Sequence, residues 1–183
     1  MIKEIITDNG QLKNGTETKK VERLRPHALI GYQKDHAKKL SGALNVLLAN
    51  YAVHYQKLLN FHWNVKGPDF FDVHEKFEQE YNKAKEIIDD VAERIRIFGM
   101  KPMSTMKAYL NTANIREVES DLTSDQMIEE ILSDYQILLE SLVDVLDTAI
   151  EIGDGGTEDL MKGYIKYVEN NHWMWTAFST KNK

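Results

Sequence analysis

The sequence contains no cysteine, and it has only 3 proline and 10 glycine residues among 183. The lack of cysteine excludes disulfides, thiolate zinc sites, iron–sulfur clusters and cysteine nucleophiles, so any metal must be bound by histidine and carboxylate groups. The scarcity of proline and glycine leaves few residues for the many turns that a many-stranded β fold needs. The length suits one domain, and 42% apolar residues are enough to build its core.

Positively charged residues are also fewer than negatively charged ones: the chain has 23 Lys and Arg and 29 Asp and Glu, which gives a net charge of −6. The surface as a whole is therefore unattractive to the phosphates of nucleic acids. No apolar run reaches the length of a membrane span, and the opening MIKEIITDNG lacks the apolar core of a signal peptide. We expect a cytoplasmic protein that does not contact membranes.

Residues 1–30 have a different balance of charge, with six basic and four acidic residues, which leaves −8 for the remainder. The stretch TDNGQLKNGTETKK has no apolar period and predicts a flexible, mildly basic N-terminal arm. The basic residues of this arm are the candidates for contact with DNA: Lys3, Lys13, Lys19, Lys20, Arg23 and Arg25.

Residues 31–180 are expected to form an all-α, ferritin-like four-helix bundle, followed by a short tail over 181–183. Apolar residues recur at steps of three and four in four long segments, about 36–63, 70–98, 124–152 and 157–178. Thr123 or Ser124 is a plausible cap for the third helix, and Thr157 for the fourth. The connection over 99–122 is long enough to hold a short extra helix and to cross the bundle, which predicts that the second and third helices lie parallel.

Histidine and carboxylate residues gather around the second predicted helix. These candidate metal ligands are His62, His74, Glu78, Asp89 and Glu93. The last four point within about a third of a turn of one another, and such a ligand set suits iron, manganese or zinc. A solvated charged face is the plain alternative.

Two of these residues are too far apart to share a metal within one chain, since His74 and Asp89 are 15 positions apart, which corresponds to about 22 Å of helix. Two antiparallel copies of the helix, related by a twofold axis near Asn82, would bring His74 of one copy to Asp89 and Glu93 of the other. A site of this kind implies an oligomer.

The strings HWNVKGPDFFDVHEKFEQEY and IDDVAERI closely resemble the Dps family, the mini-ferritins, as do GMKPMSTMKAYL and NNHWMWTAF. The resemblance covers about residues 40–178. It implies a homododecamer that oxidises Fe(II), preferentially with hydrogen peroxide, and stores the ferric product in its hollow interior. Iron is then substrate and product of a ferroxidase, and no organic cofactor is expected.

The family pattern implies roles for individual residues. His62 and His74 would come from one subunit, and Asp89 and Glu93 from its twofold mate. Glu78 matches an acidic ligand that is often Asp, one methylene shorter, and Trp63 matches the tryptophan that lies beside the metal. Four acidic residues resemble those near the threefold pores through which iron enters: Glu151, Asp154, Glu158 and Asp159.

Two further features of the sequence have competing interpretations. Residues 117–161 carry fourteen Asp and Glu and no Lys or Arg, which indicates either a cation-attracting surface or a solvated face. Glu169 and His172 have the E-x-x-H spacing of a site inside one bundle, but the second such motif is missing. We therefore expect a structural or surface role for His172, and an interior or interface position for His54.

Three functions are compared on this basis. The first is ferroxidation with iron storage, which removes peroxide and Fe(II) together and so protects DNA from oxidative damage. The alternative is a DNA-binding, compacting nucleoid protein in which many copies of the arm make weak contacts that add together. A simple scaffold for partners leaves the spacing of the histidines and carboxylates unexplained.

Overall fold

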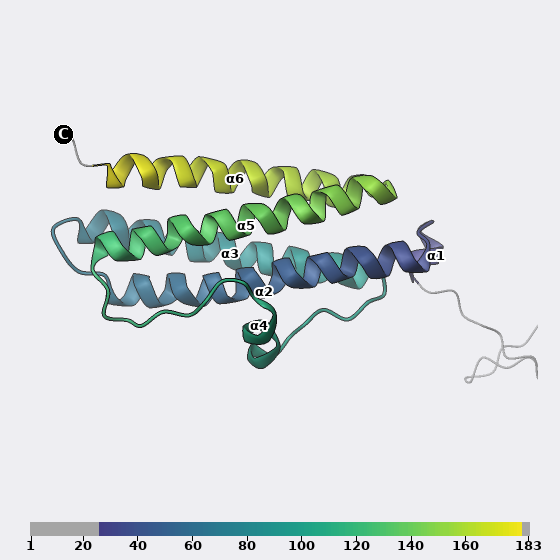
Figure 1. Ribbon diagram of the computed structural model, residues 1–183, viewed down its shortest axis with the longest axis horizontal. Coiled ribbons are helices and arrows are strands. Elements are labelled where there is room, and N and C mark those ends of the chain that lie inside the picture. Colours follow the sequence, from purple (N-terminus) through teal and green to yellow (C-terminus); the bar gives the residue numbers. More distant parts are fainter. Residues whose placement is uncertain (1–25, 181–183) are drawn as a thin grey trace, which may run out of the picture.

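The computed structural model describes residues 26–180, which contain four long helices, two short ones and no strand (Figure 1). The prediction of an all-α bundle with a short extra helix in the long connection is confirmed. The helices are α1 (Pro26–Leu29), α2 (Lys34–Asn64), α3 (Phe70–Ile97), α4 (Met106–Thr112), α5 (Ser124–Ile152) and α6 (Gly155–Ser179). The basic residues of the predicted arm, Lys3 to Arg25, and the tail 181–183 lie outside the described residues, whereas α1 falls within the last part of that predicted arm.

The direction of the helices follows from the ion pairs between their ends. Lys39 near the start of α2 contacts Glu151 at the end of α5, so these two helices are antiparallel. Arg94 near the end of α3 contacts Asp154, just beyond α5, so α3 and α5 run the same way, as Figure 1 shows. The parallel arrangement predicted from the length of the second connection is therefore confirmed.

The long connection between α3 and α5 is attached to α2 through two asparagines. Asn45 accepts the backbone N–H of Met103 at 2.7 Å. Asn50 accepts the N–H of Asn114 at 2.7 Å and donates to Ser141 of α5 at 2.8 Å. Because these bonds satisfy backbone N–H groups of the connection, they hold the segment around α4 against the side of the bundle.

The core lies between the four long helices, where the apolar faces predicted from the periodicity meet. The Phe61 and Phe77 rings pack with their centroids 5.7 Å apart, and Trp175 of α6 lies 5.4 Å from Phe77. Each fully buried Leu, Ile or Phe contributes about 1.5–3 kcal/mol to stability. This packing fixes α3 against α2, and with it the histidines at their joined ends.

The turn between α5 and α6 corrects one prediction. Thr123 caps α5 in a capping box with Gln126, as expected, but α6 is capped by Asp154 and not by Thr157. Gly153 ends α5 in the left-handed conformation, with φ of 73°. This reversal places the Asp154 carboxylate where it accepts the Thr157 N–H at 3.2 Å, so Thr157 lies inside the first turn. Within residues 26–180, no helix is long and apolar enough to cross a membrane.

Candidate metal centre

His62 and His74 face each other across the turn that joins α2 to α3. Gly67, with φ of 133°, reverses the chain between them. His62 Nδ1 donates to the backbone oxygen of His74 at 3.0 Å, and His74 Nδ1 donates to the backbone oxygen of His62 at 2.8 Å. The two rings stack with centroids 3.8 Å apart and planes at 20°.

This pair of hydrogen bonds decides which ring nitrogens are free. A carbonyl oxygen only accepts hydrogen bonds, so each Nδ1 carries its proton. In the neutral imidazole the lone pair is then on Nε2, and this is the form in which histidine binds a metal. Anchoring the opposite nitrogen also fixes the orientation of the ring. His62 and His74 thus present two oriented nitrogen donors on one patch of surface.

The groups around the two histidines are mostly aromatic. The Phe70 ring stacks on His74 at 4.9 Å, and the edge of Tyr81 meets His62 at 5.3 Å. The Tyr81 hydroxyl also donates to Glu78 Oε1 at 3.3 Å. Since Tyr81 contacts His62, the exposed Glu78 carboxylate lies on the same side of α3 as the histidines. Trp63 is 65% exposed, so in the single chain its ring has little covering it.

Asp89 and Glu93 lie on the exposed surface of α3, about four turns from His74. The structure brings His62 to His74 but does not bring either of them to these carboxylates. Within residues 26–180, no three His, Asp or Glu side chains form a group that could hold a metal ion. One chain therefore contains two separated halves of the expected ligand set.

A shallow groove lies along α3 and includes Asp89. It has a volume of about 620 Å³, and its lining residues are Asn82, Lys85, Glu86, Ile88, Asp89 and Ala92. Asn82 is the residue through which the sequence places the twofold axis. The exposed side of α3 is thus concave at the place where the sequence predicts that α3 of a second copy packs.

Among the acidic residues expected at a pore, Asp154 requires a correction, because its side chain is fully buried. Its carboxylate accepts hydrogen bonds from Arg94, the Thr157 hydroxyl and the Tyr32 hydroxyl. Burial acts to raise the pKa of Asp154, but the bonds from Thr157 and the charge of Arg94 outweigh it and hold the pKa below its ordinary value. Asp154 is a capping and bridging residue, and its charge does not face solvent.

The other three acidic residues expected at a pore remain accessible. Glu151 is exposed and pairs with Lys39, whose hydrogen bond and charge lower the pKa of the Glu151 carboxyl. Glu158 pairs with Lys162 of the same helix, with Nζ and Oε1 2.5 Å apart. Asp159 is exposed. Part of the negative charge is thus balanced by lysines from outside the acidic run, which a count within residues 117–161 cannot reveal.

Asp159 lies close to one of the predicted metal ligands. A groove of about 230 Å³ runs between the end of α3 and the start of α6, and Glu93, Asp90 and Asp159 all line it, with Arg94 at its side. The structure therefore joins a residue expected at the pore to one expected at the metal site.

The two other histidines for which the sequence predicted a role, His54 and His172, lie where it placed them. His54 is buried, and its Nδ1 lies 2.9 Å from Asp134 Oδ2. His172 is half-buried on α6, and Glu169 is exposed. Neither belongs to a group that could hold a metal among the described residues.

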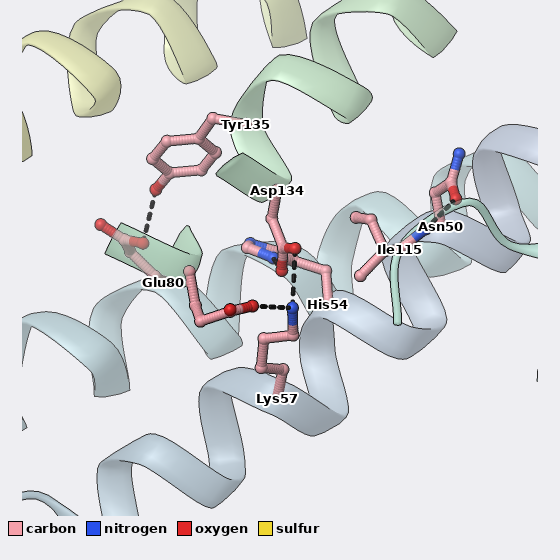
Figure 2. Close-up of polar contacts among 8 residues, drawn as sticks. Asn50, His54, Lys57, Glu80, Ile115, Asp134 and Tyr135 are labelled. Atoms are coloured by element: carbon pink, nitrogen blue, oxygen red, sulfur yellow. Dashed lines mark hydrogen bonds and ion pairs between the residues drawn. The ribbon is translucent and has the colours of Figure 1, made fainter. Parts of the chain in front are cut away.

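A set of buried charges inside the bundle was not expected from the sequence (Figure 2). Lys57 contacts Asp134 at 2.8 Å, and Glu80 accepts hydrogen bonds from Tyr135 and from Trp175 Nε1. Burial raises the pKa of the Glu80 carboxyl, although its hydrogen bonds and nearby positive charge oppose the shift. One signal was available, since Lys57 lies three residues after His54 and next to Leu58 of the apolar stripe.

The chain is similar in sequence to ferritin-like proteins. A model of the ferritin-like domain matches residues 41–182. General stress protein 20U of Bacillus subtilis is 40% identical over 142 residues, which cover 78% of this chain and 98% of that protein. DNA protection during starvation protein 2 of Bacillus anthracis is 41% identical over 141 residues, which cover 77% of this chain and 97% of that protein.

Solved structures agree with this result. The Dps protein of Vibrio cholerae O1, described as a member of a broad superfamily of ferritin-like diiron-carboxylate proteins, matches with a TM-score of 0.83 and 36% identity. The match covers 87% of this chain and all of that one. A Dps protein from Bacillus brevis matches with a TM-score of 0.78 and 36% identity, over 81% of this chain and 99% of that one.

Proposed function

This chain belongs to the Dps family of ferritin-like proteins, and on that premise we propose that it oxidises Fe(II) at sites shared between two subunits and stores the ferric product. The observation that carries the proposal is the separation of the ligand set on α3. Two oriented imidazole nitrogens lie at one end of an exposed helical face, and Asp89 and Glu93 lie near the other.

A second copy of α3, packed antiparallel in the groove near Asn82, completes the ligand set. The twofold operation carries Asp89 and Glu93 of the mate to His62 and His74, and it does the same in reverse, so each pair of chains makes two sites. Glu78, held by Tyr81, supplies a further carboxylate on the histidine side. The exposed ring of Trp63 is then covered by the partner chain.

The ligands of this site suit Fe(II) as a substrate. Neutral imidazole and carboxylate groups bind the ion and leave coordination positions open for the oxidant. Two Fe(II) ions supply the two electrons that reduce one hydrogen peroxide, with two protons, to two water molecules. Peroxide and Fe(II) are thereby consumed together, and no hydroxyl radical is released near DNA.

Iron reaches the site along the acidic groove between α3 and α6. Asp159 and Asp90 attract the cation, and Glu93 lines the same groove. Glu158 lies one residue before Asp159 and adds to the negative potential, partly offset by Lys162. Asp154 supports this region by capping α6 and is not part of the path.

The assembly is a homododecamer of about 254 kDa, built from twelve chains of 21.2 kDa. An anaerobic Fe(II) titration followed by hydrogen peroxide tests the function, with absorbance of the ferric product and particle mass recorded together. We expect saturable Fe(II) binding, fast oxidation by peroxide and a gain of mass in an intact particle. A monomer, or oxidation no faster than that of Fe(II) in buffer, would contradict the proposal.

DNA binding is the second candidate, and it is favoured by the name of the Bacillus anthracis relative, a DNA protection during starvation protein. The basic residues that would carry it are those of the N-terminal arm. Twelve arms on one particle would add their weak contacts together. The net charge of −6 on each chain opposes this attraction, so we place DNA binding second to iron oxidation.

A further inference from the structure

The interior of the bundle contains a group of polar side chains from three helices (Figure 2), and Glu130, whose side chain is 40% exposed, lies at its edge. His54 and Lys57 come from α2, Glu80 from α3, and Asp134 and Glu130 from α5. Asp134 is at the centre, with Oδ2 2.9 Å from His54 Nδ1 and Oδ1 2.8 Å from Lys57 Nζ. Lys57 Nζ also donates to Glu130 Oε2 at 3.1 Å.

These are the residue types with which a ferritin-like bundle can hold metal ions in its core, namely carboxylates and histidines that point inward from facing helices. In this chain the cation among them is the ammonium group of Lys57, whose side chain is only 2% exposed. It lies between two carboxylates, where a bound metal ion would otherwise balance their charge. Within residues 26–180 no three His, Asp or Glu side chains form a group that could hold a metal ion, so an ion in the place of the ammonium would have Asp134 and Glu130 as its nearest protein ligands.

The cluster reaches the surface through Glu130, and Lys57 also borders a cleft. A cleft of about 330 Å³ leads to Lys57 between α2 and the segment 117–120, and Trp63 and Glu117 stand on its walls. Without the Lys57 side chain, a cation at the position of its ammonium would lie next to Asp134 and Glu130.

We propose that Lys57 determines where this protein binds metal: its ammonium group occupies the cation position inside the bundle and keeps divalent ions out. A divalent ion could enter only by displacing the buried ammonium, which would lose both of its carboxylate partners. The ferroxidase site between subunits rests on the proposed function. The exclusion of divalent ions from the interior of the bundle does not.

Removing the ammonium tests the proposal with Co(II) as the probe, under argon and without oxidant. We expect Lys57→Met to bind one more Co(II) per chain than the unmodified protein in equilibrium dialysis, and to gain a higher Tm when Co(II) is added. Adding Asp134→Asn to Lys57→Met removes the central ligand and should restore the original stoichiometry. Lys66→Met, which breaks the exposed pair with Asp121, is the matched control and should bind no additional Co(II).

If Lys57→Met does not fold, Lys57→Gln replaces it in the same Co(II) measurements. The glutamine removes the positive charge but keeps a hydrogen-bond donor next to Asp134. No additional Co(II) and no shift in Tm in the folded variant would overturn the proposal, as would additional Co(II) that persists after Asp134→Asn. The result is independent of the boundary site, since that site contributes equally to every protein compared. Failure of the unmodified protein to oxidise Fe(II) would refute the proposed function and leave this comparison unchanged.

Discussion

His62 and His74 bind each other's backbone, each through its Nδ1 and each to the other's carbonyl oxygen, at 3.0 and 2.8 Å. The two bonds join the end of α2 to the first turns of α3 and leave both Nε2 atoms free. The same two side chains thus connect the helices through hydrogen bonds and provide two nitrogen donors for a metal.

The first prediction concerns these two donors. His62→Ala or His74→Ala should lower the rate of peroxide-driven Fe(II) oxidation by at least ten-fold, because each removes one nitrogen ligand. His172→Ala changes a half-buried histidine on α6 and should leave the rate unchanged. Stopped-flow absorbance of the ferric product measures the rate, and circular dichroism shows whether the helices are retained. An undiminished rate in His74→Ala would remove this residue from the site.

The second prediction concerns stability at the turn between α5 and α6. Asp154→Asn should destabilise the protein at neutral pH by about 2–4 kcal/mol, because it leaves Arg94 without its buried partner. The pKa of Asp154 is lowered on folding, so the carboxylate contributes stability at pH values above its ordinary pKa of 3.8. That contribution is lost as the pH falls through the lowered pKa.

Urea unfolding of both proteins checks this at several pH values. The difference in midpoint should be largest near pH 7 and should shrink as the solution is made more acidic than about pH 4. A difference that stays constant through this range would show that the charge of Asp154 is not what stabilises the turn.

Much of the fold was predictable because its signals are local. The four long helices follow from apolar residues at steps of three and four, and the parallel arrangement of α3 and α5 follows from the length of the connection between them. The separation of His74 from Asp89 also follows from sequence, since helical rise alone shows that one chain cannot join them.

Other features depend on contacts between distant residues and could not be predicted. Asp154 looks like a surface acid in its own turn, and only Arg94, sixty residues earlier, shows that it is buried. Lys57 looks like one more helical lysine until Asp134 of α5 is placed beside it. In both cases a buried charge is recognisable only through its partner on another helix.

The third prediction concerns the supply of iron. Replacing Glu158 by Gln and Asp159 by Asn should slow Fe(II) uptake and weaken its dependence on salt, because two charges near the groove are lost. Equilibrium binding at the histidine site should be retained. Glu129→Gln with Glu169→Gln removes the same charge from exposed positions of α5 and α6, away from the groove, and serves as the control. Equal uptake by both double variants at low salt would show that the groove does not guide iron.

The fourth prediction concerns DNA. If the protein binds DNA, deletion of residues 1–20 should abolish retardation of duplex DNA in a gel, and binding by the full chain should fall steeply as salt is raised. Oxidation of Fe(II) by the truncated protein should be unaffected. Retardation that survives the deletion would assign DNA binding to the bundle.

The central claim is that one site takes its ligands from two chains, and mixing inactive variants tests it most directly. His74→Ala subunits reassembled with an equal amount of Glu93→Ala subunits should recover about a quarter of the original oxidation capacity, because half of the pairs are mixed and each mixed pair has one intact site of two. His62→Ala mixed with His74→Ala should recover none, since both changes damage the same half. With subunit exchange verified by mass, absence of recovery in the first mixture, or equal recovery in both, would contradict the shared site.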